Sequence, residues 1–364
     1  MQTPRGYSYL DQAHPGLNRL PREFLGEFPT PLEHRHTDRL PLWIKRDDLT
    51  HPVYGGNKLR KLEYALGQAI SRGHRSVATF GAAGSNHALA TAVHAASLGL
   101  ECTCLLGPQP AGPAVCRTLN RHLTLGTRLV PWGGSRADRL ALYRRLFHGP
   151  DAAHRPWIIP IGGSTWHGTV GYVNAAFELA AQIRAGHAPE PDFVYLPLGT
   201  MGTVAGLAAG LAAAGLRTRV VAARVVIEKI ADEERTRRLG AKTTALLHRL
   251  DPAFPAVRTA QMNLEVRDEF LGEGYAVPTA AAREAVEWAA AEPGLGLDLR
   301  LETTYSGKAL SALLADAASG RLDGRTVLFW NTYSSAPTNA PDDRPIRPGL
   351  PGPLARYFET PGAL

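Results

Sequence analysis

Short apolar segments alternate with helical segments through most of this chain, and this alternation constrains its fold more than any other feature. Residues 76–80 are apolar and end at a glycine turn, after which an alanine-rich helical segment extends to Leu98. The same order of strand, glycine turn and helix recurs over residues 192–214. Strands that are joined through helices pair in parallel and are covered on both faces. The sequence therefore predicts an α/β fold with mostly parallel sheets.

The chain is long enough for two lobes. It has 364 residues, of which 44% are hydrophobic, and chains of this size usually divide into more than one core. We expect a large lobe from residues 1–50 and 170–364, and a small lobe from residues 51–169. The first 40 residues and the tail after Pro337 are rich in proline, so we expect an arm with short turns and an irregular end.

The apolar periodicity gives the expected elements. We expect strands at residues 42–45, 76–80, 100–106, 127–131, 157–161, 192–198, 220–226 and 327–330. We expect helices at residues 58–71, 85–98, 114–123, 136–147, 168–185, 204–214, 227–250, 279–291 and 306–318.

Composition excludes several classes of protein. The net charge is +7, but the charges are scattered and form no basic stripe with aromatic residues, so a nucleic-acid partner is not expected. The spacing of the three cysteines matches no zinc pattern, and their odd number argues against a disulfide framework. We find no apolar run that would target or span a membrane. We therefore expect a cytoplasmic protein without a metal, a nucleic-acid partner or a membrane anchor.

The segment Gly55-Gly56-Asn57-Lys58 carries the first candidate functional residue. Two glycines allow a tight turn that can deliver Lys58 into a pocket, just before the helical period begins. A buried amine in such a position is a candidate nucleophile or Schiff-base partner. The alternative is an ordinary helix N-terminus with solvated lysines.

Two glycine turns at helix starts offer sites for anions. One of them, Gly199-Thr200-Met201-Gly202-Thr203, follows an apolar strand. Its backbone amides, the helix dipole and two hydroxyls suit a phosphate. The alternative is a plain tight turn between the strand and the helix. At Gly84-Ser85-Asn86-His87, Ser85 and Asn86 can cap a helix, bind a carboxylate, or do both. Ser85 can also act as an acid or base, and His87 is a candidate for lining the pocket. An amine, a phosphate cradle and a carboxylate site together suit pyridoxal 5'-phosphate and an amino-acid substrate.

The chain resembles the fold-type II pyridoxal phosphate enzymes (the tryptophan synthase β-like fold), and within them the D-cysteine desulfhydrase and 1-aminocyclopropane-1-carboxylate deaminase family. The resemblance covers about residues 20–335. The matching motifs are Ile44-Lys45-Arg46-Asp47-Asp48-Leu49, Gly55-Gly56-Asn57-Lys58, Arg60-Lys61-Leu62-Glu63, Ser85-Asn86-His87, Gly162-Gly163-Ser164, Gly171-Tyr172, Gly199-Thr200-Met201-Gly202-Thr203, Gly274-Tyr275 and Tyr305-Ser306-Gly307-Lys308-Ala309.

The resemblance implies roles for these residues, and it implies that the large lobe binds the cofactor. Lys58 would form the Schiff base and move the substrate proton, Lys61 and Gly199–Thr203 would hold the phosphate, and Asn86 would contact the ring hydroxyl. Further implied residues are Ser85, Tyr275 and Tyr305 for substrate and proton handling, Thr332 or Ser306 for the pyridine nitrogen, and Ser85, Asn86, His87, Gly163, Ser164 and Tyr333 for substrate binding. A neutral hydroxyl at the pyridine nitrogen would favour β-elimination over transamination.

The chain departs from the family pattern in two segments. It has Glu302-Thr303-Thr304-Tyr305 where relatives usually read Asp-Pro-Val-Tyr, and Asn331-Thr332-Tyr333-Ser334-Ser335 where they usually read His-Thr-Gly-Gly. Met201 stands where glycine is commoner. Replacing two glycines beside the cofactor adds side chains where backbone normally lies close. The departures therefore bear on the substrate and not on the cofactor.

The resemblance implies a homodimeric enzyme of amino-acid metabolism. The expected reaction is proton abstraction at Cα of a small amino acid, followed by β-elimination to a 2-oxo acid, ammonia and a leaving group such as sulfide. The alternatives are deamination of 1-aminocyclopropane-1-carboxylate, β-replacement or racemisation in a specialised pathway, and a catalytically silent relative that binds a ligand.

Overall fold

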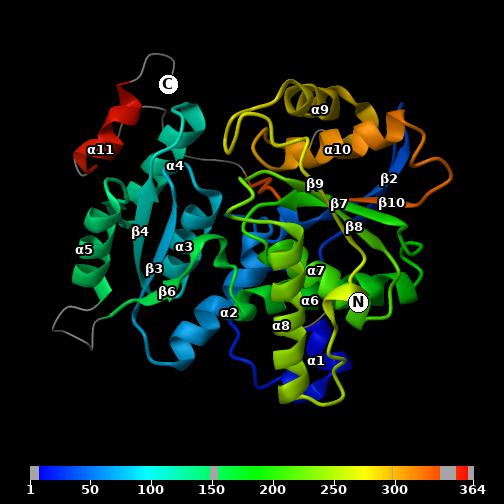
Figure 1. The fold of residues 1–364 in the computed structure, drawn as a ribbon, viewed down its shortest axis with the longest axis horizontal. Coiled ribbons are helices and arrows are strands. Elements are labelled where there is room, and N and C mark those ends of the chain that lie inside the picture. The colour runs from blue at the N-terminus through cyan, green and yellow to red at the C-terminus, as the bar shows by residue number, and fades with distance from the viewer. Residues whose placement is uncertain (1–7, 148–154, 297, 337–349, 360–364) are drawn as a thin grey trace. The chain divides into compact units, whose positions relative to one another are not determined.

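The structure is a computed structural model that forms two compact units. It describes residues 8–147, 155–296, 298–336 and 350–359. The first unit contains the described chain up to Tyr64 together with Ser164–Ala336, and the second contains Ala65–Gly163 together with residues 350–359. Each unit has its own mostly parallel sheet flanked by helices, which confirms the expected fold class (Figure 1).

The six-stranded sheet of the first unit is parallel except at one edge. Its strand order is β1 (Leu32–His36), β2 (Pro41–Arg46), β10 (Val327–Asn331), β7 (Phe193–Leu198), β8 (Arg219–Arg224) and β9 (Leu264–Arg267). Only the β1–β2 pair is antiparallel among these neighbours. The parallel strands bring their carboxyl ends, and the loops that follow them, to one edge of the sheet.

Helices cover both faces of this sheet (Figure 1). One face is covered by α6 (Trp166–Arg184) and α7 (Gly202–Ala213) with α8 (Glu233–Leu250) beyond them, and the other by α9 (Ala280–Ala291) and α10 (Ser306–Ala318). Leu328 and Trp330 pack toward the first set of helices, whereas Val327 and Phe329 pack toward the second. This alternation explains why the central strand is apolar at every position, since its side chains point alternately to two buried faces.

A buried ionic cluster joins β2 to the helices of the first unit. Arg60, on α2 (Lys58–Ser71), donates to Asp47 Oδ1 at 2.7 Å and to Glu178 Oε2 at 2.9 Å. Lys45 Nζ lies 2.5 Å from Glu178 Oε1, and Tyr172 donates to Asp47 Oδ2 at 2.6 Å. All five side chains are at most 1% exposed. Although burial opposes ionisation, the charges of Arg60 and Lys45 lower the pKa of Glu178 to about 2.

A glycine allows α6 to pack tightly against α2. A Cβ at Gly171 would lie 2.0 Å from the carbonyl oxygen of Arg60, which no side chain could tolerate. This contact accounts for glycine in the Gly171-Tyr172 motif and fixes the first turn of α2, where Lys58 lies.

The second unit has a parallel four-stranded sheet. Its order is β5 (Arg128–Pro131), β4 (Glu101–Gly107), β3 (Ser76–Ala82) and β6 (Trp157–Ile159). The helices α3 (Asn86–Ser97) and α4 (Pro113–Thr124) cover one face, and α5 (Arg136–Phe147) contributes Phe147 to the other.

The described part of the tail packs on the second unit. It contains α11 (Gly352–Ala355) and a 3-10 turn at Arg356–Phe358. Leu354, Tyr357 and Phe358 join the core of the α3 and α4 face, and the Tyr357 hydroxyl accepts from Gln109 N at 2.9 Å. We expected an irregular tail in the large lobe, but its apolar residues find a core elsewhere. The second unit begins at Ala65 and not at residue 51, and this part of it ends at Gly163 and not at residue 169, because the first two turns of α2 and all of α6 belong to the first unit.

Three further differences arise where the apolar period is weak. The N-terminal arm contains α1 (Tyr9–Ala13) and β1, and β9 lies at the other edge of the sheet; edge strands are short and mix charged with apolar residues, so their sequences read as loops. The helix expected from residue 227 begins at Glu233, because Asp232 caps it by accepting from Arg235 N at 2.7 Å.

Over the described residues, the helices are too short or too polar to cross a lipid bilayer.

The turn before α7 holds a strained residue. Met201 has φ 71° and ψ −43°, and Gly202 N donates to Thr200 O at 3.0 Å across it. This is a γ-turn of the rare, strained hand. Only glycine adopts a positive φ without steric cost.

We predict that this strain makes a glycine variant at position 201 more stable than an alanine variant, the reverse of the usual order of stability. Met201→Gly should be more stable to unfolding than Met201→Ala by roughly 1 kcal/mol, because alanine keeps the strained dihedral and glycine does not. The matched control is Ala213→Gly in the last turn of α7, which should lower stability in the ordinary way. Urea unfolding measures all three variants; equal stability of the two Met201 variants would contradict the strain.

His122 is a buried polar residue in the second unit. It lies on α4, is 0% exposed, and neither ring nitrogen has a hydrogen-bond partner among the described residues. Burial lowers its pKa to about 3. The imidazole is therefore neutral in the folded protein at pH 7.

We predict a pH-dependent loss of stability that originates at His122. Its folded pKa lies below the unfolded value near 6.5, so its contribution is complete above pH 6.5 and is lost as the pH falls toward 3. At pH 5 the loss should be about 2 kcal/mol. Urea unfolding at pH 7 and pH 5 should show this loss in the parent and in the exposed control His187→Gln, but not in His122→Leu. An unchanged pH dependence in His122→Leu would contradict the assignment.

Candidate active site

The turn before α2 is held against the segment that follows β10. Gly56 has φ 93°, and a Cβ there would lie 2.9 Å from Thr332 O. Asn57 N donates to Thr332 O at 3.1 Å, and Gly56 N donates to Asp47 O at 2.9 Å. The glycines are therefore required by a close backbone approach, and the turn carries Lys58 to the carboxyl edge of the sheet.

The Lys58 amine has a depressed pKa. Burial lowers the pKa to about 8, against the opposing charge of Glu302. The Nζ atom donates to Asn57 Oδ1 at 3.0 Å and lies 5.6 Å from the centre of the Tyr305 ring. About a tenth of this amine is neutral at pH 7, far more than for an ordinary lysine, and a nucleophilic lysine reacts in its neutral form.

Asn57 connects Lys58 to the loop at the start of α7. Its Oδ1 accepts from Lys58 and its Nδ2 donates to Thr203 Oγ1 at 3.1 Å. Asn57 belongs to a matching motif, but no function was predicted for it from the sequence. An amide side chain can accept and donate hydrogen bonds at once, and this property of a residue next to Lys58 is the signal that could have identified Asn57 as a site residue.

The loop Gly199–Thr203 presents backbone amides and hydroxyls at the start of a helix. Met201, the N-cap residue of α7, makes no side-chain cap, so the first-turn amides and the positive end of the helix dipole favour an anion there. Ser164 Oγ lies 2.9 Å from Thr200 Oγ1 and accepts from Gly202 N at 3.1 Å. Ser164, which we expected at the substrate, contacts this loop.

Lys61 lies one helical turn after Lys58. Its side chain is 2% exposed, and burial, together with the charge of Lys58, holds its pKa well below the usual lysine value. Two amines on one face of a helix suit one electrophilic and one anionic group on a single ligand.

A pair of tyrosines lies beside the amine. The hydroxyl oxygens of Tyr275 and Tyr305 are 2.7 Å apart and their rings meet edge to face. Burial raises the pKa of both hydroxyls, so both are protonated at neutral pH. Lys308, in the same motif as Tyr305, donates to Leu271 O at 2.7 Å and Gly274 O at 3.2 Å, which fixes the segment that carries Tyr275.

Glu302 caps the helix that begins after Tyr305. Its carboxylate accepts from the backbone N–H of Thr304, Tyr305 and Ser306 at 2.7–2.9 Å. In the sequence, Glu302 stands out only as part of a departure from the family pattern. A carboxylate before a helix start is a recognisable cap signal, and here it also supplies negative charge near Lys58.

The two hydroxyls expected at a pyridine nitrogen differ in their surroundings. The Ser306 hydroxyl is 2.9 Å from Glu302 N and 3.2 Å from Glu302 O, so it is engaged within its own turn. Thr332 is 7% exposed, and its hydroxyl makes no hydrogen bond to the residues that the structure describes. Thr332 is therefore the hydroxyl with spare bonding capacity.

The departure Asn331–Ser335 is bonded to the turn that carries Lys58. Ser334 Oγ accepts from Gly55 N at 3.0 Å, and Ser335 Oγ donates to Asp48 Oδ2 at 2.6 Å. Tyr333 N donates to Asn331 Oδ1 at 3.3 Å. The serines that replace the usual pattern thus make specific contacts, which sequence reasoning missed because they depend on tertiary approach.

The remaining candidates lie in the second unit. Ser85 caps α3 by accepting from Ala88 N at 3.3 Å, and Asn86 is the first residue of that helix. Gly163 is buried with φ 62° in the turn after β6. His87 is 4% exposed, with Nε2 2.9 Å from Thr79 Oγ1, a structural contact that accounts for this histidine without a substrate.

The donor set of the first unit suits pyridoxal phosphate. A lysine amine of lowered pKa suits an aldehyde, and an uncapped helix N-terminus with Thr200, Thr203 and Lys61 suits a phosphate monoester. A Cβ at Gly202 would lie 2.8 Å from Ser164 Oγ, so glycine keeps the loop close to its neighbour.

Comparison with known proteins agrees with this chemistry. Residues 23–332 match the family described as pyridoxal-phosphate dependent enzyme. The chain is 36% identical to the D-cysteine desulfhydrase of Salmonella typhimurium, over 87% of this chain and 94% of that protein. It is 35% identical to the D-cysteine desulfhydrase of Salmonella schwarzengrund, with the same coverage.

Solved structures show the same fold. An ACC deaminase homologue is 27% identical and covers 91% of this chain and 95% of its own, with a TM-score of 0.72. Serine racemase from Dictyostelium discoideum is 16% identical, covers 90% of this chain and 97% of its own, and has a TM-score of 0.58, which shows likeness of fold alone. The amine, the loop and the matched sequences lead to one conclusion: the chain belongs to the fold-type II pyridoxal-phosphate dependent enzymes.

Proposed function

We propose that this enzyme removes a β-substituent and ammonia from a small amino acid, and that D-cysteine is its first candidate substrate. The observation that carries the proposal is the Lys58 amine of lowered pKa, hydrogen-bonded through Asn57 to the loop that starts α7. The relatives named D-cysteine desulfhydrase, which match most of the chain, support this choice of substrate.

In the proposed site, Lys58 would hold the cofactor through its amine and would move the substrate proton. Pyridoxal phosphate, when bound, stabilises negative charge at the substrate Cα. Lys61 and the Gly199–Thr203 loop bind the phosphate. The lowered pKa of Lys58 supports its role as a base, because an amine that titrates near 8 accepts a proton at neutral pH and can return it.

We assign the pyridine nitrogen to Thr332 in preference to Ser306. The support is the spare bonding capacity of Thr332, in contrast with the Ser306 hydroxyl, which is engaged with Glu302. A neutral hydroxyl cannot stabilise a protonated pyridine as a carboxylate would. Elimination is favoured by this arrangement over transamination.

The tyrosine pair is the proposed proton donor to the leaving group. Tyr305 and Tyr275 share a hydrogen bond of 2.7 Å and remain protonated, so one hydroxyl can give up a proton while the other stabilises the resulting charge. We propose that Ser85 and the start of α3 bind the substrate carboxylate and that Asn86 contacts the ring hydroxyl of the cofactor. We also propose Gly163, Ser164 and Tyr333 as substrate-binding residues. The hydrogen bond of His87 with Thr79 weakens the case for His87.

Ring opening of 1-aminocyclopropane-1-carboxylate is the second candidate reaction, and the similarity to an ACC deaminase homologue supports it. That branch commonly has a carboxylate after the tyrosine, whereas this chain has Ser306. β-Replacement and racemisation are further candidates because of the changed segment Asn331–Ser335, and a silent ligand-binding relative is the non-catalytic one.

We further propose a homodimer in the cytoplasm. The large apolar side chains of the first unit that a partner subunit would cover include Phe24, Leu49 and Val53, which are 39–52% exposed. Free cysteines suit a reducing compartment. Sedimentation analysis tests the assembly, and a monomer at all concentrations would exclude it.

Cofactor binding at Lys58 is the first prediction that follows from the proposed function. Purified protein given pyridoxal phosphate should develop an absorbance band near roughly 410–430 nm, and borohydride reduction should leave a cofactor adduct on Lys58. Lys58→Ala should lose both, whereas the exposed control Lys242→Ala should keep both. An adduct that persists on another lysine in Lys58→Ala would refute the assignment.

Substrate choice is the second prediction. In a panel of D- and L-cysteine, D- and L-serine, β-chloroalanine and 1-aminocyclopropane-1-carboxylate, D-cysteine should give the most 2-oxo acid and ammonia, together with sulfide. Tyr305→Phe should lower the rate by roughly 10²-fold or more, since it removes an acid group, without loss of the cofactor band. Activity on the cyclopropane alone would favour the second reaction, and inactivity on every compound would overturn the proposed elimination.

A further inference from the structure

Two cysteines in the second unit form a sulfur pair that the proposed reaction does not use. Cys102 and Cys104 are two residues apart on β4, so their side chains leave the same face of the strand. Their Sγ atoms are 3.8 Å apart. Cys104 is 0% exposed, and Cys102 is partly exposed.

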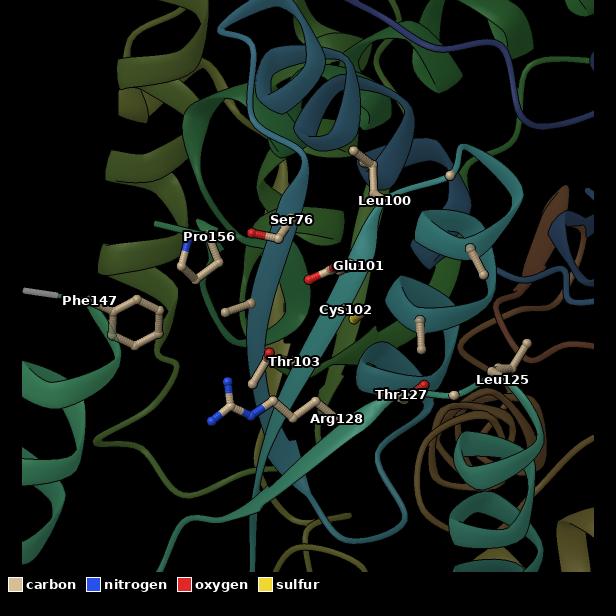
Figure 2. Close-up of a pocket in the computed structure, with 15 residues that line it drawn as sticks. Ser76, Leu100, Glu101, Cys102, Thr103, Leu125, Thr127, Arg128, Phe147 and Pro156 are labelled. Carbon is tan, nitrogen blue, oxygen red and sulfur yellow. The ribbon is translucent and has the colours of Figure 1, made fainter. Parts of the chain in front are cut away.

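Cys102 opens onto a cavity of about 500 Å³. Figure 2 shows Cys102 among its lining residues, with Thr103 on the opposite side of β4. On the cysteine side the lining includes Ala92 of α3 and Leu125 after α4, which belong to the same apolar core as Cys104. A small solute can therefore approach the sulfur pair through Cys102, in surroundings that favour a soft ligand over a strongly hydrated one.

The geometry of the pair does not favour a disulfide. A disulfide requires sulfur atoms about 2.05 Å apart, and residues two apart on an extended strand have Cα atoms about 6.6 Å apart, near the upper limit for a bridge. β4 is also paired with β3 over Glu101–Gly107 and with β5 over Thr103–Leu106, so the strand cannot shorten freely.

The same separation fits two thiolates on one metal ion. With metal–sulfur bonds of about 2.3 Å, sulfur atoms 3.8 Å apart subtend an angle of about 110° at the ion, close to the tetrahedral value. No movement of the strand is needed. Soft thiolate ligands select thiophilic ions such as Cu(I) and Zn(II).

We propose that Cys102 and Cys104 form a bidentate site for a thiophilic d¹⁰ cation, with the remaining coordination positions open to the cavity. Groups of three or more metal-ligating side chains are absent among the described residues, so water or a small solute ligand such as a free thiol completes the coordination.

Binding exchanges protons for the metal. Each thiol loses its proton as its metal–sulfur bond forms, and Cys104 also gives up its hydrogen bond to Ala88 O, which spans 3.6 Å. The hydrogen bond with Cys102 and burial raise the pKa of Cys104. Affinity should therefore rise with pH, because fewer protons remain to be displaced.

Titration of the cofactor-loaded protein with Cd(II), a spectroscopic probe for thiolate ligands, tests the site. The parent should bind one ion per chain and develop a thiolate-to-metal band in the ultraviolet. Cys102→Ser and Cys104→Ser should each weaken binding by at least about tenfold and diminish the band. The matched control Cys116→Ser, at a buried cysteine of the same core that donates to Tyr357 O, should bind as the parent does.

Two outcomes would overturn the proposal: full-strength binding in the double variant Cys102→Ser/Cys104→Ser, or equal loss in Cys116→Ser. A second measurement on the parent protein avoids dependence on variant folding. Bound Cd(II) should protect Cys102 from alkylation by iodoacetamide, as read by peptide mass, and alkylation at an unchanged rate would contradict the site. Displacement of Cd(II) by Zn(II) or by Cu(I) then identifies the preferred ion.

Discussion

The bidentate contact of Arg60 with Asp47, completed by Glu178, is the interaction on which the rest of the active-site structure depends. It brings the end of β2, the first turn of α2 and the middle of α6 together. Such a cluster adds little net stability, because desolvation of the charges offsets their attraction, but removal of one partner leaves a buried charge and costs roughly 3–5 kcal/mol. The main effect of this cluster is therefore to fix the positions of β2, α2 and α6. Asp47 also accepts from Gly56 N through its backbone carbonyl, so the same residue that anchors Arg60 fixes the turn before Lys58.

The position of Lys58 determines its chemistry. The turn buries the amine beside Tyr305 with one amide acceptor, and incomplete solvation lowers its pKa. The amine is nevertheless not isolated, because Asn57, which accepts from Lys58, also donates a hydrogen bond to Thr203. One short chain of contacts thus joins the group that suits an aldehyde to the helix start that suits a phosphate. A change in the α7 turn would reach Lys58 through Asn57, and the strained Met201 lies in that turn.

The sequence predicted the helices and central strands well, because apolar periodicity reports burial on one or two faces. It predicted edge strand β1 poorly, since that strand is short and mixes charged with apolar residues. The site residues likewise divide into those that a local sequence pattern indicates and those that depend on tertiary contacts. Lys58 and the Gly199–Thr203 loop could be proposed from local motifs, whereas the spare hydroxyl of Thr332 and the contact of His87 with Thr79 depend on the folded arrangement. Sequence spacing alone carries no information on such contacts.

The segment after β10, which departs from the family pattern, is bonded to the turn that carries Lys58. Ser334 and Ser335 make hydrogen bonds to the loop before Lys58. A Cβ at Gly56 would lie 2.9 Å from Thr332 O, so there is no space for a side chain between the loop and this segment. The segment therefore cannot shift without moving the amine. A relative with glycines at positions 333 and 334 would lack the Ser334 contact with Gly55 and would have a more adaptable loop. The contacts of Ser334 and Ser335 therefore fix this loop against the turn that carries Lys58, and they fix the backbone on both sides of Tyr333, since Asn57 N also donates to Thr332 O.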